Sequence, residues 1–317
     1  MNEVTEFATL VELLRWRIKH QANETLYTFL TDGETNEVHL SYGELDRQAR
    51  RIAARLQSEA PPGSRALLLY QPGLEFISAF FGCLYAGIVA VPAYPPRNPR
   101  HAPRIQTIAS DAEAGFCLTS SKVLGRSREL FGVVPGLERM IWLATDEIRP
   151  DADPGWAGPK IDAETLAYVQ YTSGSTSTPK GVMVSHGNLR HNLKFLCGGR
   201  GHTKLVSWLP LFHDLGLIYA ILQALYGGFP AILMAPAAFL QRPFRWLQAL
   251  SRSGASTSMG PNFAYELCVQ KISEAEKKEL DLSRWQTALI GAEPVRLETL
   301  ERFSAAFASC GFQANSL

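Results

Sequence analysis

Between residues 65 and 119 the sequence alternates short apolar runs with stretches of helical length, and this alternation limits the fold more than any other feature. We expect the order strand 66–70, helix 74–85, strand 88–91, helix about 102–110 and strand 116–119. The apolar runs are nearly continuous, which is typical of strands that are buried on both faces. Strands that alternate with helices in this way form a parallel sheet covered by helices on both sides. The sequence therefore predicts an α/β fold.

A weak internal repeat indicates a second, similar sheet. Leu84-Tyr85-Ala86-Gly87 precedes one apolar run and Leu225-Tyr226-Gly227-Gly228 precedes another. We therefore expect two similar lobes with mainly parallel sheets, in a chain long enough to bury two cores. Thr9-x-x-Glu12 and Ser41-x-x-Glu44 are capping boxes that begin helices, and Asp32-Gly33 is typical of a hairpin turn. Further elements are expected near 218–225, 242–251 and 261–272 as helices and at 287–290 as a strand.

Charge and composition exclude several classes of protein. The 31 basic and 30 acidic residues leave a net charge of +1, so no global field attracts nucleic acid or anionic lipid. The five cysteines are widely spaced, without a Cys-x-x-Cys pair, which favours a reducing cytoplasm and no structural metal. Residues 76–96 and 215–241 are uncharged and long enough to span a bilayer. Each contains a glycine break, a strand-like run and then proline, so we predict no transmembrane segment.

The segment from Tyr171 to Gly181 lies between two apolar runs, 166–171 and 182–184, and is predicted to be a polar loop that joins two strands. It contains six Ser and Thr hydroxyls, two glycines and one lysine, Lys180, and no acidic residue. Glycine lets backbone N–H groups approach a ligand, hydroxyls add donors, and lysine supplies a compact positive charge. We therefore predict that this loop binds a polyphosphate.

The composition of the loop allows two other interpretations. The P-loop of nucleotide hydrolases does not fit, because Pro179 stands at its second glycine and Gly181 at its magnesium-binding hydroxyl. A flexible Ser/Thr linker between lobes stays open as an alternative, although linkers do not usually lie between two apolar strands.

Three further stretches hold candidate site residues. Residues 208–216 are apolar and aromatic up to the adjacent His213 and Asp214. Neighbours on a strand point to opposite faces, so we expect no catalytic dyad there, and taken alone His213 fits a half-buried core position better than a functional one. Residues 258–263 have the pattern of a strand end, a Gly-Pro turn and a helix start, and residues 291–294 that of a turn after a strand. Taken alone, residues 258–263 are explained by structure, and the turn 291–294 is explained as well by structure as by function.

Taken in order, these motifs resemble those of the fatty acyl-AMP ligases, which belong to the adenylate-forming superfamily of acyl-CoA synthetases, luciferases and peptide-synthetase adenylation domains. The resemblance rests on Thr172-Ser173-Gly174-Ser175-Thr176 with Pro179-Lys180-Gly181, on Trp208-Leu209-Pro210-Leu211-Phe212-His213-Asp214, on Gln241-Arg242-Pro243, on Gly260-Pro261-Asn262-Phe263 and on Gly291-Ala292-Glu293-Pro294. It covers essentially the whole chain, with the motifs in family order and at family spacing.

The resemblance implies a role for each of these residues. His213, Thr176 and Lys180 are expected to be catalytic, and Thr176 is also expected to bind a metal ion. The nucleotide would be bound by Thr172, Ser173, Gly174, Ser175, Thr176 and Lys180 at the phosphates and by Gly291, Ala292, Glu293 and Pro294 at the adenine. The fatty acid would contact Trp208, Phe212, His213, Asp214, Gly260 and Phe263.

The resemblance also implies a domain organisation. Residues 1–61 would form the first part of lobe B, residues 62–204 lobe A up to the phosphate loop and the following helix, and residues 205–317 the remainder of lobe B. The barrel subdomain, the ribose-binding aspartate, the ligase-specific insertion and the C-terminal lid with its catalytic lysine do not occur in this sequence. We therefore expect the 317-residue chain alone to form acyl-adenylate poorly.

The activity implied is the conversion of a fatty acid to an acyl-adenylate with release of pyrophosphate, using ATP and Mg²⁺. The acyl group would then pass to the phosphopantetheine thiol of an acyl carrier protein, either separate or fused downstream, in lipid, polyketide or lipopeptide biosynthesis. An acyl-CoA synthetase and a catalytically incompetent nucleotide-binding fragment remain the alternatives.

Overall fold

The computed structural model describes residues 7–95, 102–127, 137–149, 155–172, 179–197, 201 and 203–317. The chain divides into two compact units. Unit 1 consists of Met1–Glu24, Ser41–Phe195 and Phe212–Asp214, and unit 2 of Thr25–Leu40, Leu196–Leu211 and Leu215–Leu317. Residues before position 62 are thus shared between the units, whereas the sequence assigned all of them to lobe B. The lobe boundaries stay a prediction.

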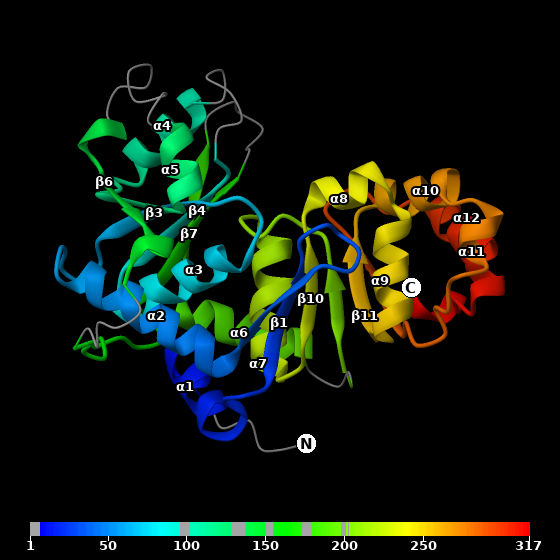
Figure 1. Ribbon diagram of the computed structural model, residues 1–317, viewed down its shortest axis with the longest axis horizontal. Coiled ribbons are helices and arrows are strands. Elements are labelled where there is room, and N and C mark those ends of the chain that lie inside the picture. The colour runs from blue at the N-terminus through cyan, green and yellow to red at the C-terminus, as the bar shows by residue number, and fades with distance from the viewer. Residues whose placement is uncertain are drawn as a thin grey trace. The chain divides into compact units, whose positions relative to one another are not determined.

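Unit 1 is built on a six-stranded sheet in the order β6-β5-β3-β4-β7-β8. Its strands are β3 (Arg65–Leu69), β4 (Val89–Ala93), β5 (Phe116–Thr119), β6 (Ile141–Ala144), β7 (Leu166–Thr172) and β8 (Lys180–Ser185), in cyan and green in Figure 1. The neighbours from β6 to β7 are parallel, and β8 is antiparallel to β7 at the edge. The three strands predicted between residues 65 and 119 and their parallel arrangement are confirmed.

Helices cover both faces of the unit 1 sheet. They are α1 (Leu10–Gln21), α2 (Tyr42–Gln57), α3 (Leu74–Ala86), α4 (Ala102–Asp111), α5 (Ser121–Ser127) and α6 (His186–Cys197), with 3₁₀ turns at Leu137–Arg139 and Thr145–Glu147. On one face, the ring of Phe80 in α3 lies 5.9 Å from that of Tyr168 in β7. On the other, Ile105 and Ile108 of α4 share a core with Leu67 of β3.

Unit 2 has a second six-stranded sheet, in the order β12-β11-β9-β10-β1-β2. Its strands are β1 (Thr25–Leu30), β2 (Glu37–Ser41), β9 (Leu205–Ser207), β10 (Ala231–Met234), β11 (Thr257–Gly260) and β12 (Thr287–Ile290). The neighbours from β12 to β1 are parallel. β1 and β2 are adjacent and are joined by residues 31–36, which confirms the hairpin predicted at Asp32-Gly33.

The unit 2 sheet is also covered on both faces. Its helices are the π-helix η5 (Leu215–Leu222), α7 (Gln223–Gly227), α8 (Pro236–Gln241), α9 (Phe244–Ser253), α10 (Asn262–Lys271), α11 (Glu274–Lys277) and α12 (Leu297–Phe307), with 3₁₀ turns at Ala308–Cys310 and Ala314–Ser316. The Thr257 hydroxyl of β11 lies 2.7 Å from the Tyr219 hydroxyl of η5. The next residue, Ser258, accepts a hydrogen bond from Trp246 of α9 at 2.8 Å. Since successive strand residues point to opposite faces, η5 and α9 lie on opposite sides of the sheet.

The helix starts follow the predicted caps with one difference. At α2, Ser41 accepts from the Glu44 N–H and the Glu44 carboxylate accepts from the Ser41 N–H at 2.9 Å, so the capping box is complete. At α1, Thr9 accepts from the Glu12 N–H at 3.2 Å, but the Glu12 carboxylate accepts from the Ala8 N–H at 2.8 Å. α1 therefore has one half of the predicted box.

Both long uncharged stretches fold as a helix followed by a strand, as their glycine breaks predicted. α3 leads through Gly87 into β4, and α7 leads through Gly228 into β10; the two glycines have φ of +70° and +72°. Across the residues that the structure describes, none of the helices combines the length and the apolar character needed to cross a membrane.

Candidate functional site

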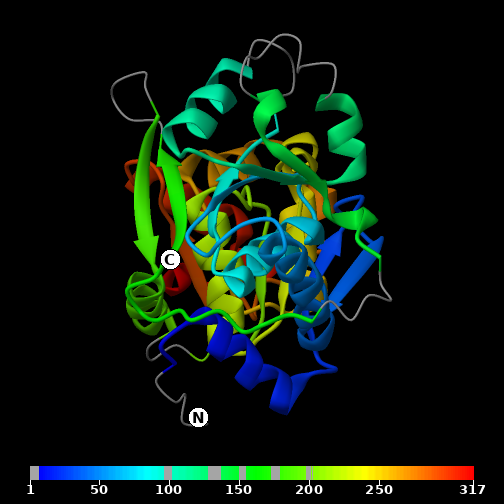
Figure 2. The ribbon, with the colours of Figure 1, turned by 90° about the vertical axis from the view of Figure 1, so that its left-hand side faces the viewer.

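The β7–β8 pair flanks the predicted phosphate loop. Figure 2 shows the two strands side by side as green arrows, and Thr172 at the end of β7 is the register partner of Lys180 at the start of β8. Both side chains are exposed. Ser173, Gly174, Ser175 and Thr176 lie outside the described residues. The structure therefore places one hydroxyl and one ammonium group on the two sides of the base of this loop.

Close packing fixes this end of the β7–β8 pair. A Cβ atom at Gly181 would lie 2.9 Å from Val169 and 3.0 Å from the Tyr171 ring, so only glycine lets β8 approach β7 so closely. The Tyr171 hydroxyl donates a hydrogen bond to Asp111 at the end of α4, at 2.5 Å. Burial raises the pKa of Tyr171, and the neighbouring Asp111 raises it further, so the hydroxyl stays a donor.

The histidine motif, which is residues 212–214 with His213 at its centre, packs against β7 within unit 1. The Gln170 side-chain amide donates to the Phe212 carbonyl at 3.3 Å, and the Phe212 ring lies 5.2 Å from that of Tyr94. His213 Nδ1 and Asp214 Oδ1 form an ion pair. The expectation that these two side chains point to opposite faces was wrong, because they lie beyond the end of β9, outside any strand. That they form no catalytic dyad stays a prediction.

The ion pair changes the acid–base behaviour of the imidazole. The hydrogen bond to Asp214 raises the pKa of His213, while partial burial opposes this effect. The two side chains are 54% and 51% exposed, so water weakens their attraction. Asp214 also adds to the effect of burial in raising the pKa of Tyr168 on β7. The pair therefore keeps His213 protonated, and able to donate a hydrogen bond, at higher pH than an isolated histidine.

Two of the predicted site turns meet in unit 2. The Phe263 N–H donates to the Glu293 carboxylate at 2.8 Å, and the Asn262 amide donates to the Pro294 carbonyl. These turns follow the adjacent parallel strands β11 and β12, whose ends lie at the same sheet edge. Ala292 has φ of +68°, a conformation that costs free energy in a residue with a Cβ and that is common at functional sites. The structure thus brings Gly260 and Phe263 together with residues 291–294.

Trp208 lies in an aromatic cluster behind this edge. It is 3% exposed and stacks on Phe239 at 4.0 Å with a 13° angle between the rings. Trp246 and Phe263 meet Trp208 edge-on at 6.0 and 6.1 Å, and Phe263 itself is 46% exposed. Phe239 and Trp246 were not predicted as site residues. The available signal was their place on the apolar faces of the helices on either side of Pro243.

Among the described residues, no group of three or more His, Cys, Asp or Glu side chains is arranged to hold a metal ion. Thr176, the predicted metal-binding residue, lies outside the described part of the chain. Mg²⁺ that accompanies a nucleotide is usually bound through phosphates, water and one or two protein groups, so it needs no dedicated cage.

Comparison with known proteins gives consistent matches over nearly the whole chain. A family model described as "AMP-binding enzyme" matches residues 14–314. The chain is 46% identical over 319 residues to the medium-chain-fatty-acid–[acyl-carrier-protein] ligase JamA of Moorena producens, with 98% of this chain and 54% of the relative covered. It is 35% identical over 316 residues to the long-chain-fatty-acid–AMP ligase FadD32 of Mycolicibacterium smegmatis, with 96% and 50% covered.

A solved structure gives the same result for the fold. The fatty acyl-adenylate ligase from L. pneumophila, solved in complex with acyl adenylate and pyrophosphate, matches with a TM-score of 0.91 and 41% identity. The match covers 99% of this chain and 55% of that one. The resemblance found in the sequence and the predicted α/β fold are therefore confirmed, and the chain spans about half the length of the proteins it matches.

Proposed function

This chain belongs to the AMP-binding enzyme family, and from that premise we propose that it forms part of the site in which an enzyme activates a fatty acid with ATP. The products are an acyl-adenylate and pyrophosphate. The relatives named as medium-chain and long-chain fatty acid ligases support fatty acids as the substrate class. Since the chain spans about half of those relatives, the activity is proposed for the protein in its full encoded length.

The observation that carries the proposal is the pairing of Thr172 with Lys180 at the base of a loop rich in Ser, Thr and Gly. A hydroxyl and an ammonium group at that position suit the β- and γ-phosphates of ATP, and the loop residues 173–178 would add N–H and hydroxyl donors. Lys180 acts as a fixed positive charge that stabilises negative charge as it moves onto the leaving pyrophosphate.

The reaction is an in-line displacement at phosphorus. A carboxylate oxygen of the fatty acid forms a bond to the α-phosphorus of ATP while the bond from that phosphorus to the bridging oxygen breaks, and the electron pair leaves with pyrophosphate. No covalent enzyme intermediate forms, so catalysis depends on positioning and on neutralising charge. His213, whose pKa is raised by its pairing with Asp214, is placed in this proposal at the reacting carboxylate as a hydrogen-bond donor.

The acyl chain and the adenine are assigned to unit 2. Phe263 is half-exposed and stands in front of the buried Trp208, an arrangement that suits an apolar chain entering at Phe263. The turn 291–294, with Ala292 at positive φ, is proposed to contact the adenine. Mg²⁺ would reach the site with ATP, bound by its phosphates and by Thr176, and would offset part of their negative charge.

The acceptor of the acyl group is proposed to be the phosphopantetheine thiol of an acyl carrier protein. The thiol loses its proton and its sulfur bonds to the acyl carbon of the acyl-adenylate, while the bond from that carbon to the AMP phosphate oxygen breaks and AMP leaves with the electron pair. The name of the Moorena relative supports this acceptor over coenzyme A. The five cysteines are free and four of them are buried, which supports a cytoplasmic location.

The test is ATP–pyrophosphate exchange by the protein in its full encoded length, with a series of straight-chain fatty acids. Coenzyme A and a phosphopantetheinylated carrier protein are then offered separately, and the thioester is measured. We expect exchange that depends on the fatty acid and a thioester only on the carrier. No exchange, or exchange that does not depend on added fatty acid, would contradict the proposal. A thioester on coenzyme A would favour an acyl-CoA synthetase.

A further inference from the structure

The turn between β1 and β2 is held in one conformation by Asp32. Its carboxylate accepts the N–H groups of Glu34, Thr35 and Asn36 at 2.8, 2.9 and 3.0 Å. These bonds, that of Glu34 first, lower the pKa of Asp32 to about 2. The turn therefore projects Glu34 in a fixed direction.

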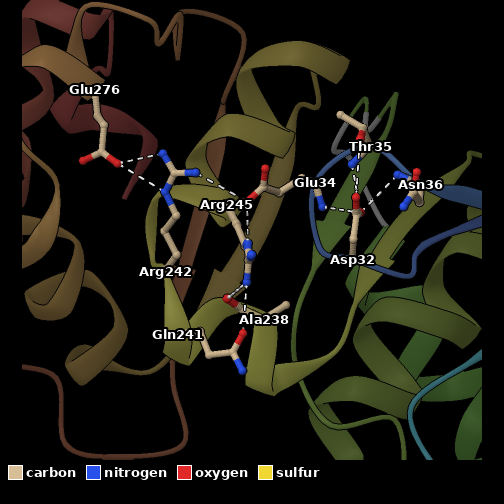
Figure 3. A network of polar contacts seen from close by, with 9 residues as sticks. All are labelled: Asp32, Glu34, Thr35, Asn36, Ala238, Gln241, Arg242, Arg245 and Glu276. Carbon is tan, nitrogen blue, oxygen red and sulfur yellow. Dashed lines mark hydrogen bonds and ion pairs between the residues drawn. The ribbon is translucent and has the colours of Figure 1, made fainter.

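Glu34 joins this turn to two arginines that flank Pro243 (Figure 3). Its carboxylate lies 2.9 Å from Nε of Arg245 and 3.4 Å from Arg242. Arg242 also pairs with Glu276 at 3.0 Å, and Glu276 is itself fixed in a capping box with Ser273. Arg245 is only 19% exposed, so its bond to Glu34 is less weakened by water than a fully exposed ion pair. We call Glu34, Arg242, Arg245 and Glu276 the arginine clasp.

The arginine clasp acts on α8. Arg245 Nη1 donates to the Ala238 carbonyl and to the Gln241 side chain, both at 3.2 Å. The turn also touches this helix directly, since a Cβ atom at Gly33 would lie 2.5 Å from the Ala238 Cβ. α8 has six residues and no side-chain cap. A helix this short is not stable by itself, so its position depends on its neighbours.

α8 in turn places Phe239, the residue after Ala238. Phe239 is completely buried and forms the stacked pair with Trp208, and Trp246 meets Phe239 edge-on at 5.7 Å. A shift of α8 therefore changes the ring against which Trp208 rests. Packed interiors transmit such shifts because they contain few voids.

We infer that Glu34, Arg242 and Arg245 are positioning residues for acyl-chain recognition, which act by holding α8 so that Phe239 stacks on Trp208. This inference rests on the proposed function, because it takes Trp208 as part of the acyl site. It gives a role to the Gln241-Arg242-Pro243 motif, which the phosphate, adenine and histidine motifs leave unexplained. The arginine clasp sets which chain lengths are accepted and leaves the use of ATP unchanged.

The test compares two glycine variants of the full-length protein. Gly33 and Gly63 have φ of +77° and +85°, so an alanine strains the backbone at both. Only at Gly33 would the new methyl group press on α8, since a Cβ at Gly63 has no neighbour within 4 Å. We expect Gly33→Ala to change the ratio of kcat/KM for a long over a short fatty acid by about tenfold, with KM for ATP unchanged, and Gly63→Ala to leave the ratio as it is.

A second variant tests the arginine clasp itself without a backbone change. Glu34→Gln removes the negative charge that pairs with both Arg245 and Arg242. Glu266→Gln is the matched control in the same unit, because it removes the negative charge on α10 that pairs with Arg302. We expect the chain-length ratio to move in Glu34→Gln only. An unchanged ratio in both Gly33→Ala and Glu34→Gln, with wild-type activity present, would show that the arginine clasp is only structural. A wild-type protein that activates no fatty acid would overturn the proposed function and this inference with it.

Discussion

The side-chain amide of Gln170 donates a hydrogen bond to the carbonyl oxygen of Phe212 at 3.3 Å. Gln170 is on β7, two residues before Thr172, and Phe212 directly precedes His213. The bond therefore joins the strand that precedes the proposed phosphate loop to residues 212–214, which include His213. Gln170 is 8% exposed, and its Oε1 atom has no hydrogen-bond partner among the described residues. Loss of a buried hydrogen bond of this kind costs about 1–3 kcal/mol.

We expect Gln170→Leu to lower kcat for acyl-adenylate formation by about tenfold or more, because the histidine motif loses its fixed position. KM for ATP should change little. Gln223→Leu is the matched control: Gln223 is 1% exposed and donates to the Leu196 carbonyl at 3.5 Å in unit 2. Both variants should lose stability, and only Gln170→Leu should lose rate; equal losses of rate in ATP–pyrophosphate exchange would contradict the positioning role.

The His213–Asp214 pair predicts a specific pH dependence. Its hydrogen bond raises the pKa of His213, so the imidazole stays protonated to higher pH than a free histidine. Asp214→Asn removes this effect, and the basic limb of the rate profile should move to lower pH. NMR titration of His213 in both proteins measures the same shift directly. A profile that does not move would show that protonated His213 is not required.

The pair also contributes to stability, with a sign that can be checked. Because folding raises the pKa of His213, the protonated imidazole adds to the free energy of unfolding at pH values below its unfolded pKa of about 6.5. This contribution is lost as the pH rises through the pKa of the folded state. Because both groups are half-exposed, this contribution is small. The rate profile is therefore the more sensitive measurement.

Lys180→Ala should lower kcat/KM for ATP by a factor of about 10² or more, because the charge proposed to face the leaving pyrophosphate is lost. Binding of the fatty acid should stay nearly intact. Lys194→Ala removes another exposed lysine, on α6, and is expected to leave the rate unchanged. An unchanged kcat/KM for ATP in Lys180→Ala would show that Lys180 does not bind the phosphates.

Local patterns in the sequence predicted the elements well, for a physical reason. The apolar runs between residues 65 and 119 indicate strands that are buried on both faces. Ser41 and Glu44 indicate a capping box, whose hydrogen bonds form within four residues. Such signals need no knowledge of distant parts of the chain. The helix predicted near 218–225 begins earlier, and its part over residues 215–222 is a π-helix, which was not predicted because that hydrogen-bond pattern leaves no separate sequence signal.

The candidate site was harder to predict because it depends on contacts between distant residues. The hydrogen bonds of Asn262 and Phe263 to residues 293–294 join positions that are about thirty apart in the sequence. The residues of either turn do not indicate that the other turn is its partner. The His213–Asp214 pair was missed because these residues were assigned to a strand. Glu34 and Arg245 are 211 positions apart and meet only through the pairing of β1 with β10 and the packing of α8. Family resemblance supplied the expected roles of single residues, but not these contacts.

Phe263→Trp should shorten the preferred fatty acid. The Phe263 N–H is fixed by Glu293 and its ring stands before Trp208, so a larger ring fills the space where the acyl chain is proposed to enter. We expect kcat/KM for a long fatty acid to fall about tenfold or more relative to a medium one. Phe195→Trp, at a residue that is 81% exposed on α6, is the control. Equal responses of medium and long acids would place the acyl channel elsewhere.

His186 predicts how the stability of unit 1 depends on pH. It is 1% exposed, and its Nδ1 atom accepts the N–H of Leu10 in the first turn of α1 at 3.3 Å. Burial lowers the pKa of His186 to about 4, so the folded protein holds the neutral imidazole that this bond requires. In the unfolded chain the pKa returns to about 6.5.

Between about pH 6.5 and about pH 4 the unfolded state therefore binds a proton that the folded state excludes, and the free energy of unfolding falls as the pH falls. At about 1.4 kcal/mol for each unit of pKa, the loss across this window is on the order of 3 kcal/mol. Urea unfolding at about pH 7 and about pH 4.5 measures it. His186→Gln keeps a hydrogen-bond acceptor for Leu10 but cannot be protonated, so its stability should fall less on acidification than that of the wild type. His191→Gln, at an exposed position on α6, should behave like the wild type. If His186→Gln lost as much stability as the wild type, the acid sensitivity of unit 1 would lie in its carboxylates instead.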